Sequence, residues 1–368
     1  MLFDYKGGTR VAVAYTMARS SRSFIAKGDY EMSKRFLTIT FALFVTTFFA
    51  AQSFAALQLT YSHMFPPTHV HSKLMADWAQ EVEKRTDGRI MIQMFPGQTL
   101  VKGSQMYDGV LNGITDIGMS LFAYTRGRFP IMEVADLPLG SPNGVVSSKM
   151  IKEVFDTLQP KELDGVKVMY ITAHGPGLVH TKEKPVRSLE DLKGLKLRAT
   201  GFSAKLVSAL GGTPVAMPMP ETYQALSKGV VDGATFPYEA GKGFRLFDTI
   251  KYTTESQAVA YASGFYVVMN KDRWNSIDAA DQKIIEEINN EWFDMTAETW
   301  DKIDVIGREF AKEKGVESIT LSDEEIARWK KAVAPVVDEY IKDMDAKGFD
   351  GKKIVDLARN AIKKYSSM

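Results

Sequence analysis

The stretches YDGVLNGITDIG, residues 107–118, and YQALSKGVVDG, residues 223–233, follow one pattern. Each begins with a tyrosine, has a glycine six residues later and has an aspartate three residues beyond that. Because glycine readily adopts the left-handed conformation that ends helices, each stretch predicts a helix, a glycine stop and a short strand. This connection is common in α/β proteins, and its repetition also fits two lobes of related design.

Short apolar runs alternate with amphipathic stretches from residue 57 onward, which favours an α/β fold with largely parallel sheets flanked by helices. Two long charged stretches near the C-terminus are typical of scaffold helices with an apolar inner face. The predicted strands are 57–61, 89–95, 195–198 and a continuous one over 258–270; the predicted helices are 72–85, 279–314 and 322–364.

Composition excludes several classes of protein. With 368 residues, 45% of them hydrophobic, the chain is long enough for more than one compact unit. The 46 basic and 45 acidic residues nearly balance, so we expect no nucleic-acid partner. The absence of cysteine excludes disulfides, zinc-thiolate sites, iron–sulfur clusters and thiol nucleophiles.

Residues 32–55 have the order of a secretory signal peptide. Lys34 and Arg35 precede an apolar run over 36–51, and Ser53 and Ala55 supply the small residues of a cleavage site, so we predict cleavage after Ala55. A membrane anchor is the alternative, but the run is shorter than the roughly 18 apolar residues that usually span a bilayer. Since a signal peptide normally opens a chain, we expect residues 1–31 to be an upstream extension and translation to start at Met32.

The sequence lacks the signatures of common hydrolases, metalloproteases and nucleotide enzymes, so we predict no catalytic residues and no cofactor. Histidines are the remaining candidates for chemistry. His69 and His71 could bind a metal, but no carboxylate triad accompanies them and we predict no metal site. Pocket lining is the other role open to the histidines, and we predict it for His63 and His174.

The segment SLEDLKGLKLRATG, residues 188–201, contains the most informative charged residue, Arg198. Alternation along a strand places Lys196 and Arg198 on one face. Ligands of open α/β sheets bind beyond the carboxyl ends of strands, where Arg198 falls, and a guanidinium matches a carboxylate with two parallel hydrogen bonds. The alternative is an arginine in a structural ion pair.

These features together resemble the DctP-type substrate-binding subunits of TRAP transporters. The landmarks occur in the family's order: the signal peptide, the opening strand, TDGRI at 86–90, the segment 188–198, GGTP at 211–214, and GVVDG at 229–233 followed by Pro237. The resemblance covers residues 57–345. The resemblance implies a two-lobed periplasmic binding protein, a hinged trap with mixed or parallel sheets, crossing strands and long C-terminal helices. It also implies a partner permease driven by an ion gradient.

On this resemblance, lobe I comprises residues 56–176 and 264–303, lobe II comprises 177–263 and 304–345, and 346–368 form a C-terminal helix or tail. The family's carboxylate-binding arginine falls on Arg198. Other pocket positions fall on aromatic and apolar residues of both lobes: Leu121, Phe122, Tyr124, Met219, Phe236 and Tyr238.

The chain departs from some relatives in one respect. The stretch HGPGLVH, residues 174–180, has Leu178 where a second arginine occurs in some members. We therefore predict a small organic monoanion as ligand: a 2-oxo, 2-hydroxy or aromatic carboxylate, or a sulfonate. We expect a monomer, with a dimer as the alternative; the alternative functions are a periplasmic sensor that feeds a signalling receptor, and a secreted enzyme acting on a small organic acid.

Overall fold

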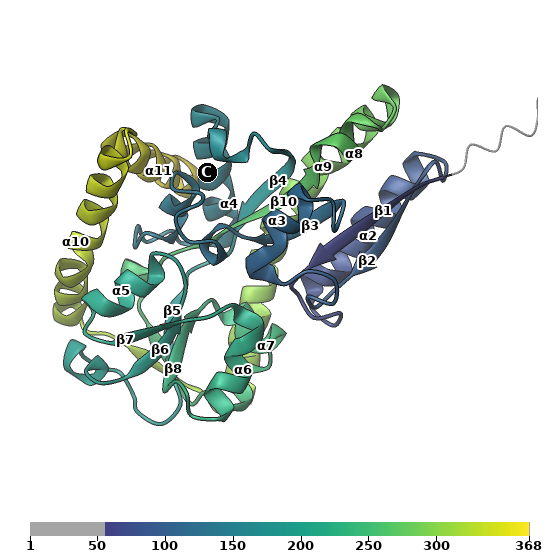
Figure 1. Ribbon diagram of the computed structural model, residues 1–368. Helices are drawn as coiled ribbons and strands as arrows, with labels where there is room; N and C mark the ends of the chain where they lie inside the picture. Colours follow the sequence, from purple (N-terminus) through teal and green to yellow (C-terminus); the bar gives the residue numbers. More distant parts are fainter. Residues whose placement is uncertain (1–55, 368) are drawn as a thin grey trace, which may run out of the picture. The chain divides into compact units, whose positions relative to one another are not determined.

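The computed structural model describes residues 56–367, which belong to one compact unit (Figure 1). The predicted upstream extension, the signal peptide and its cleavage site lie outside these residues. No helix of the described part is both long enough and apolar enough to span a bilayer.

The first sheet has five strands in the order β2-β1-β3-β10-β4. β1 runs parallel to β2 and β3, whereas β10 is antiparallel to β3 and β4, so the sheet is mixed. The predicted opening strand, helix and second strand are confirmed as β1, α2 and β2. The elements are β1 (Leu57–His63), α2 (Val70–Arg85), β2 (Ile90–Phe95), α3 (Met106–Leu111), β3 (Ile117–Leu121), α4 (Gly144–Leu158), β4 (Val166–Ala173), β10 (Gly264–Asn270) and α8 (Lys271–Asn275).

The second sheet has six strands in the order β11-β9-β5-β8-β6-β7. β7, β6 and β8 are parallel, and β5 is antiparallel to both β8 and β9. Its elements are β5 (Leu178–Thr181), β6 (Lys196–Ala199), α5 (Ser203–Ala209), β7 (Thr213–Ala216), α6 (Met219–Ser227), β8 (Gly233–Phe236), α7 (Tyr238–Gly243), β9 (Tyr252–Glu255) and β11 (Glu317–Thr320).

The repeated pattern forms the same connection in both sheets, as predicted. α3 leads to β3 past Gly113, and α6 leads to β8 past Gly229, with φ of 69° and 70° at the two glycines. The aspartates also act alike: a carboxylate oxygen of Asp116 accepts a hydrogen bond from the backbone N–H of Thr60, and one of Asp232 accepts from that of Lys196. Each aspartate therefore ties its own strand to a neighbouring one.

Two segments, 174–177 and 256–263, connect the sheets and lie antiparallel where they cross. The backbone N–H of Gly177 donates to the carbonyl of Tyr261 at 2.8 Å. The predicted continuous strand over 258–270 is therefore wrong in its first half, and β10 begins only at Gly264. Residues 258–263 are bonded to the other crossing segment and to the 3-10 helix Met132–Asp136 instead: the N–H of Ala262, for example, donates to the carbonyl of Ala135.

The helix α9 (Ala279–Glu313) confirms the prediction for 279–314. It contacts elements that belong to both sheets. It packs on α2, α4 and β4 of the first sheet and on α7 of the second. Gly307 allows the contact with α7, because a Cβ at this position would lie 2.4 Å from the carbonyl oxygen of Tyr238.

The last predicted helix, 322–364, is in fact two helices, α10 (Asp323–Ala346) and α11 (Gly351–Ser366). Gly348, with φ of 84°, breaks the helix between them. The first half of α10 buries Trp329 in the core of the second sheet, while Tyr340 belongs to a core that α11 shares with the first sheet. Like α9, α10 therefore joins both halves of the protein.

Candidate ligand-binding site

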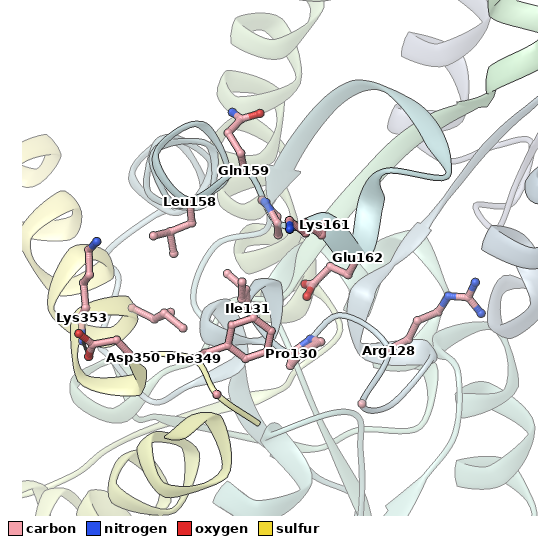
Figure 2. A pocket seen from close by; sticks show the side chains of 14 residues that line it. Arg128, Pro130, Ile131, Leu158, Gln159, Lys161, Glu162, Phe349, Asp350 and Lys353 are labelled. Atoms are coloured by element: carbon pink, nitrogen blue, oxygen red, sulfur yellow. Dashed lines mark hydrogen bonds between the residues drawn. The ribbon is translucent and has the colours of Figure 1, made fainter. Parts of the chain in front are cut away.

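A cavity of about 660 Å³ opens where the end of α4 faces the turn between α10 and α11 (Figure 2). Its charged lining residues have both signs and include Arg128, Lys161, Glu162, Asp350 and Lys353. Both lysines are exposed, and none of the predicted site residues lines this cavity. A lining with charges of both signs does not define a binding site for an organic anion.

A smaller and more enclosed cavity lies between the two sheets, and Arg198 lines it. Its free volume is about 20 Å³, which is room for about one water molecule. Its walls come from both sheets and from the crossing segments: Met64, Phe65, Leu121, Tyr124, His174, Arg198, Thr200, Met219, Pro237, Glu239, Ala240, Phe244, Tyr261, Ser263 and Phe265.

Arg198 is the only lysine or arginine among the residues that line this cavity, and it is 2% exposed. Its Nε donates to the carbonyl of Met217 at 3.0 Å, and one terminal nitrogen donates to that of Thr235 at 3.2 Å. Within residues 56–367 no carboxylate pairs with its guanidinium. A buried charge is costly unless it is paired, so this guanidinium is suited to bind an anion from outside the protein.

Asp136 does not supply the missing partner. Burial raises the pKa of this carboxyl group well above its usual range, although the charge of Arg198 acts in the opposite direction. The carboxyl group also makes no hydrogen bond or ion pair with Arg198; its side-chain partner is the hydroxyl group of Ser263.

His174 carries no compensating charge either. Burial lowers the pKa of its imidazole to about 4, so the ring is neutral at pH 7. Its Nε2 accepts from the backbone N–H of Ser263 at 3.1 Å, which leaves the proton on Nδ1, where it is donated to the carbonyl of Gly175. With both nitrogens engaged, His174 is a neutral wall that also ties the two crossing segments together.

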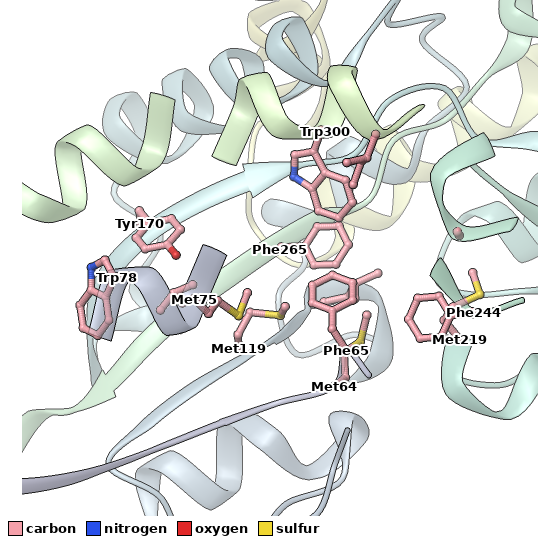
Figure 3. Packing of buried hydrophobic residues seen from close by; sticks show 14 of the residues in the cluster. Met64, Phe65, Met75, Trp78, Met119, Tyr170, Met219, Phe244, Phe265 and Trp300 are labelled. Carbon is pink, nitrogen blue, oxygen red and sulfur yellow. The ribbon is translucent and has the colours of Figure 1, made fainter. Parts of the chain in front are cut away.

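Aromatic rings form the wall on the side of the first sheet (Figure 3). Phe65 and Phe265 stack with ring centroids 6.0 Å apart, and Trp300 of α9 lies behind Phe265 at 4.8 Å. Met219 and Phe244 come from the other sheet's elements and face this group in Figure 3. A single charge surrounded by apolar and aromatic surface is the usual composition of a small-molecule site.

Of the nine residues predicted for the pocket, five line this cavity: Leu121, Tyr124, His174, Arg198 and Met219. Tyr124 also bridges the two sides, because its hydroxyl oxygen accepts a hydrogen bond from the backbone N–H of Met219 at 2.8 Å.

Comparison with known proteins identifies the family. Residues 61–343 match the family model described as "Bacterial extracellular solute-binding protein, family 7", the DctP family. The chain belongs to this family. Its relatives include TRAP-transporter solute receptors, and the chain is therefore a solute-binding protein of this type.

Three relatives of this DctP-family protein are particularly informative. A marine metagenome TRAP solute-binding protein, described as specific for aromatic acids and solved with metahydroxyphenylacetate, is 31% identical with a TM-score of 0.80; 84% of this chain and 99% of that one align. A TRAP solute-binding protein from Rhodoferax ferrireducens T118, solved with copurified benzoate, is 29% identical with a TM-score of 0.80; the alignment covers 85% of this chain and 99% of that one. The 2,3-diketo-L-gulonate-binding periplasmic protein YiaO of Escherichia coli K12 is 29% identical; the alignment covers 87% of this chain and 98% of YiaO.

The other four predicted site residues of this DctP-family protein lie outside the cavity lining. Phe236 is fully buried and stacks on His180 at 3.8 Å. The preceding Thr235 accepts a hydrogen bond from the cavity residue Tyr261, so alternation along β8 turns Phe236 to the opposite face. Phe122 likewise follows the cavity residue Leu121 and packs against Phe129 in another core.

The side chains of Tyr238 and His63 make their contacts outside the cavity. The hydroxyl of Tyr238 donates to Glu255 at 2.7 Å, and the guanidinium of Arg308 lies over its ring. His63 is buried beneath α2, where its Nε2 lies 3.4 Å from the hydroxyl of Ser72. Leu178, at the position of the missing second arginine, is also outside the cavity.

Sequence reasoning missed several cavity residues, chiefly Phe65, Phe244, Tyr261, Phe265 and Glu239. Glu239 follows the motif residue Pro237 by two positions, which is the one local signal that points to it. His69 and His71, the alternative metal ligands, are both buried, and no group of three metal-binding side chains occurs among residues 56–367.

Proposed function

We propose that this chain binds an aromatic monocarboxylate in the cavity between its sheets and delivers it to a TRAP membrane permease. The observation that carries the proposal is Arg198, a buried guanidinium that lines an aromatic cavity and has no carboxylate partner among residues 56–367. Its planar donors match a carboxylate, and the ligand's charge would offset the cost of burying the cation.

The charges of the cavity favour a monoanion over a dianion. Arg198 is the only strong cation in the lining, His174 is neutral at pH 7, and Glu239 contributes an acidic group. A second ligand carboxylate would meet no positive partner in these walls and would be repelled by Glu239. A monocarboxylate needs only the one guanidinium.

The walls favour an aromatic ligand. The rings of Phe65, Phe265 and Tyr261 offer flat apolar surface, and aromatic pairs gain beyond simple area burial. The bound ligands of the two similar solved proteins, metahydroxyphenylacetate and benzoate, are aromatic acids and support the same class here.

Binding would proceed by opening and closing of the two halves. The cavity has room for about one water molecule, so a ligand of the size of benzoate can enter only when the walls separate. The crossing segments and the long helices α9 and α10 are the connections about which such movement would occur. Bound ligand would then favour the closed form through contacts that exist only there.

The proposal includes export, with cleavage of the signal peptide after Ala55, and binding as a monomer without a cofactor. It includes no chemical step on the ligand. If the ligand recovered after long incubation with the protein is unchanged, transport binding is supported; conversion to a product would favour a secreted enzyme.

The test is identification of the ligand. Mass spectrometry of the protein purified under native conditions, followed by titration calorimetry with benzoate, phenylacetate, mandelate, benzenesulfonate, pyruvate and succinate, covers the competing classes. Tightest binding of an aromatic monocarboxylate supports the proposal. Tighter binding of succinate or of a non-aromatic acid would overturn it.

A further inference from the structure

Glu239 is a polar group of the cavity that anion binding does not use. It lies in the first turn of α7, is 5% exposed, and lines the same cavity as Arg198. One carboxylate oxygen, Oε2, lies 3.1 Å from Nε2 of His69, which belongs to the loop between β1 and α2 of the other sheet.

The hydrogen bonds of His69 fix which nitrogen faces Glu239. Nδ1 accepts from the backbone N–H of His71 at 3.2 Å, so the ring proton is on Nε2 and is donated to Glu239. Phe65 stacks on the imidazole at 4.3 Å, and Gly243 leaves no space on another side, because a Cβ there would lie 2.4 Å from the ring. The donor to Glu239 is therefore held rigidly.

The second oxygen of Glu239, Oε1, accepts no hydrogen bond from residues 56–367. Neighbouring hydroxyl groups do not serve it: that of Tyr261 donates to Thr235, and that of Ser263 donates to Asp136. This oxygen is not among the fully enclosed polar atoms that lack a partner, so it keeps some accessible surface. Because Glu239 lines the cavity, a ligand bound there can supply the donor that the protein does not.

We propose that Glu239, positioned by His69, is a specificity residue that accepts a hydrogen bond from a hydroxyl group on the ring of the ligand. This inference rests on the proposed binding of an aromatic carboxylate by Arg198. A site built to bond a hydroxyl group discriminates strongly against ligands that lack it, because its own polar group is otherwise left unpaired. The same carboxylate would reject a ring that carries a second carboxylate.

The test is titration calorimetry with benzoate and with its 3- and 4-hydroxy, methoxy and carboxy derivatives. We expect one hydroxybenzoate to bind roughly 10-fold or more tightly than benzoate, as a hydrogen bond to a charged group would give. The matching methoxybenzoate, which cannot donate, should lose this gain, and the dicarboxylates should bind more weakly than benzoate. This comparison uses the unmodified protein and needs no variant to fold.

Glu239→Gln keeps the shape and an acceptor for His69 but removes the charge. We expect it to reduce the hydroxyl preference to less than about 3-fold and to relieve the discrimination against dicarboxylates. Glu221→Gln, at an exposed position of α6 outside the cavity, is the matched control and should change neither ratio.

The outcomes separate the two proposals. If benzoate binds through Arg198 but its hydroxy and methoxy derivatives bind equally, this inference is wrong and the proposed function stands. If no aromatic carboxylate binds, the proposed function fails and this inference fails with it.

Discussion

The hydroxyl oxygen of Tyr124 accepts a hydrogen bond from the backbone N–H of Met219 at 2.8 Å. Tyr124 follows β3 of the first sheet and Met219 begins α6 after β7 of the second, so this bond joins the two halves of the protein. If the two halves open and close as proposed, replacement of Tyr124 by phenylalanine leaves that N–H without its partner in the closed form and has no effect on the open form. We expect a loss of about 1 kcal/mol, or roughly 5-fold in affinity, expressed as faster ligand dissociation with little change in association. Stopped-flow measurements with Tyr365→Phe on α11 as the control would check this; an unchanged dissociation rate would contradict it.

Arg198 gives the largest expected effect on binding. Replacement by alanine removes the one strong cation of the cavity, and we expect binding of an aromatic carboxylate to weaken by about 2–5 kcal/mol, which calorimetry would detect as near-complete loss. Lys196→Ala changes an exposed cation two residues earlier on the same strand and should leave affinity unchanged. Equal affinity of the Arg198→Ala variant and the unchanged protein would show that the anion binds elsewhere.

Local patterns were sufficient to predict much of the fold. The glycine stops at Gly113 and Gly229 were predicted correctly because a positive φ is a property of single residues. The start of β10 was not, because residues 258–263 have strand-like composition but pair with a segment some 80 residues away in sequence. The break at Gly348 was missed because the apolar pattern continues on both sides of it.

The site was predicted less completely than the fold. Arg198 could be found from its place at a strand end, but Phe236 was assigned to the cavity although the pairing of Thr235 turns it away. Glu239 was missed because its partner, His69, is 170 residues earlier in the chain. Sequence alternation gives two faces for each strand, and only the assembled sheets determine which face meets the cavity.

Asp304 should make stability depend on pH. Burial raises the pKa of this carboxyl group to about 7, although the N–H of Glu239 donates to it. Folding therefore strengthens proton binding, and this group's stabilising contribution is greatest below about pH 4 and is lost as the pH rises to about 7. Asp304→Asn, which keeps an acceptor for Glu239, should be more stable than the unchanged protein at pH 8.

Urea unfolding of both proteins between pH 4 and pH 8 measures this difference directly. The gap in unfolding free energy should widen in favour of Asp304→Asn as the pH rises. A gap that stays constant over this range would mean that Asp304 titrates at its ordinary pKa.

Replacement of Gly307 by alanine tests the contact between α9 and α7, because helix propensity and this contact change the free energy of unfolding in opposite directions. Alanine in the interior of a helix is favoured over glycine by roughly 0.5–1 kcal/mol, so α9 alone would gain stability from Gly307→Ala. The new Cβ, however, would lie 2.4 Å from the carbonyl oxygen of Tyr238, and α9 would have to move away from α7. We expect the contact to outweigh the helix preference, with a net loss of about 1–3 kcal/mol in urea unfolding. Glu309→Ala, at an exposed position on α9, is the control; a stabilised Gly307→Ala variant would show that α9 can shift away from α7 at little cost.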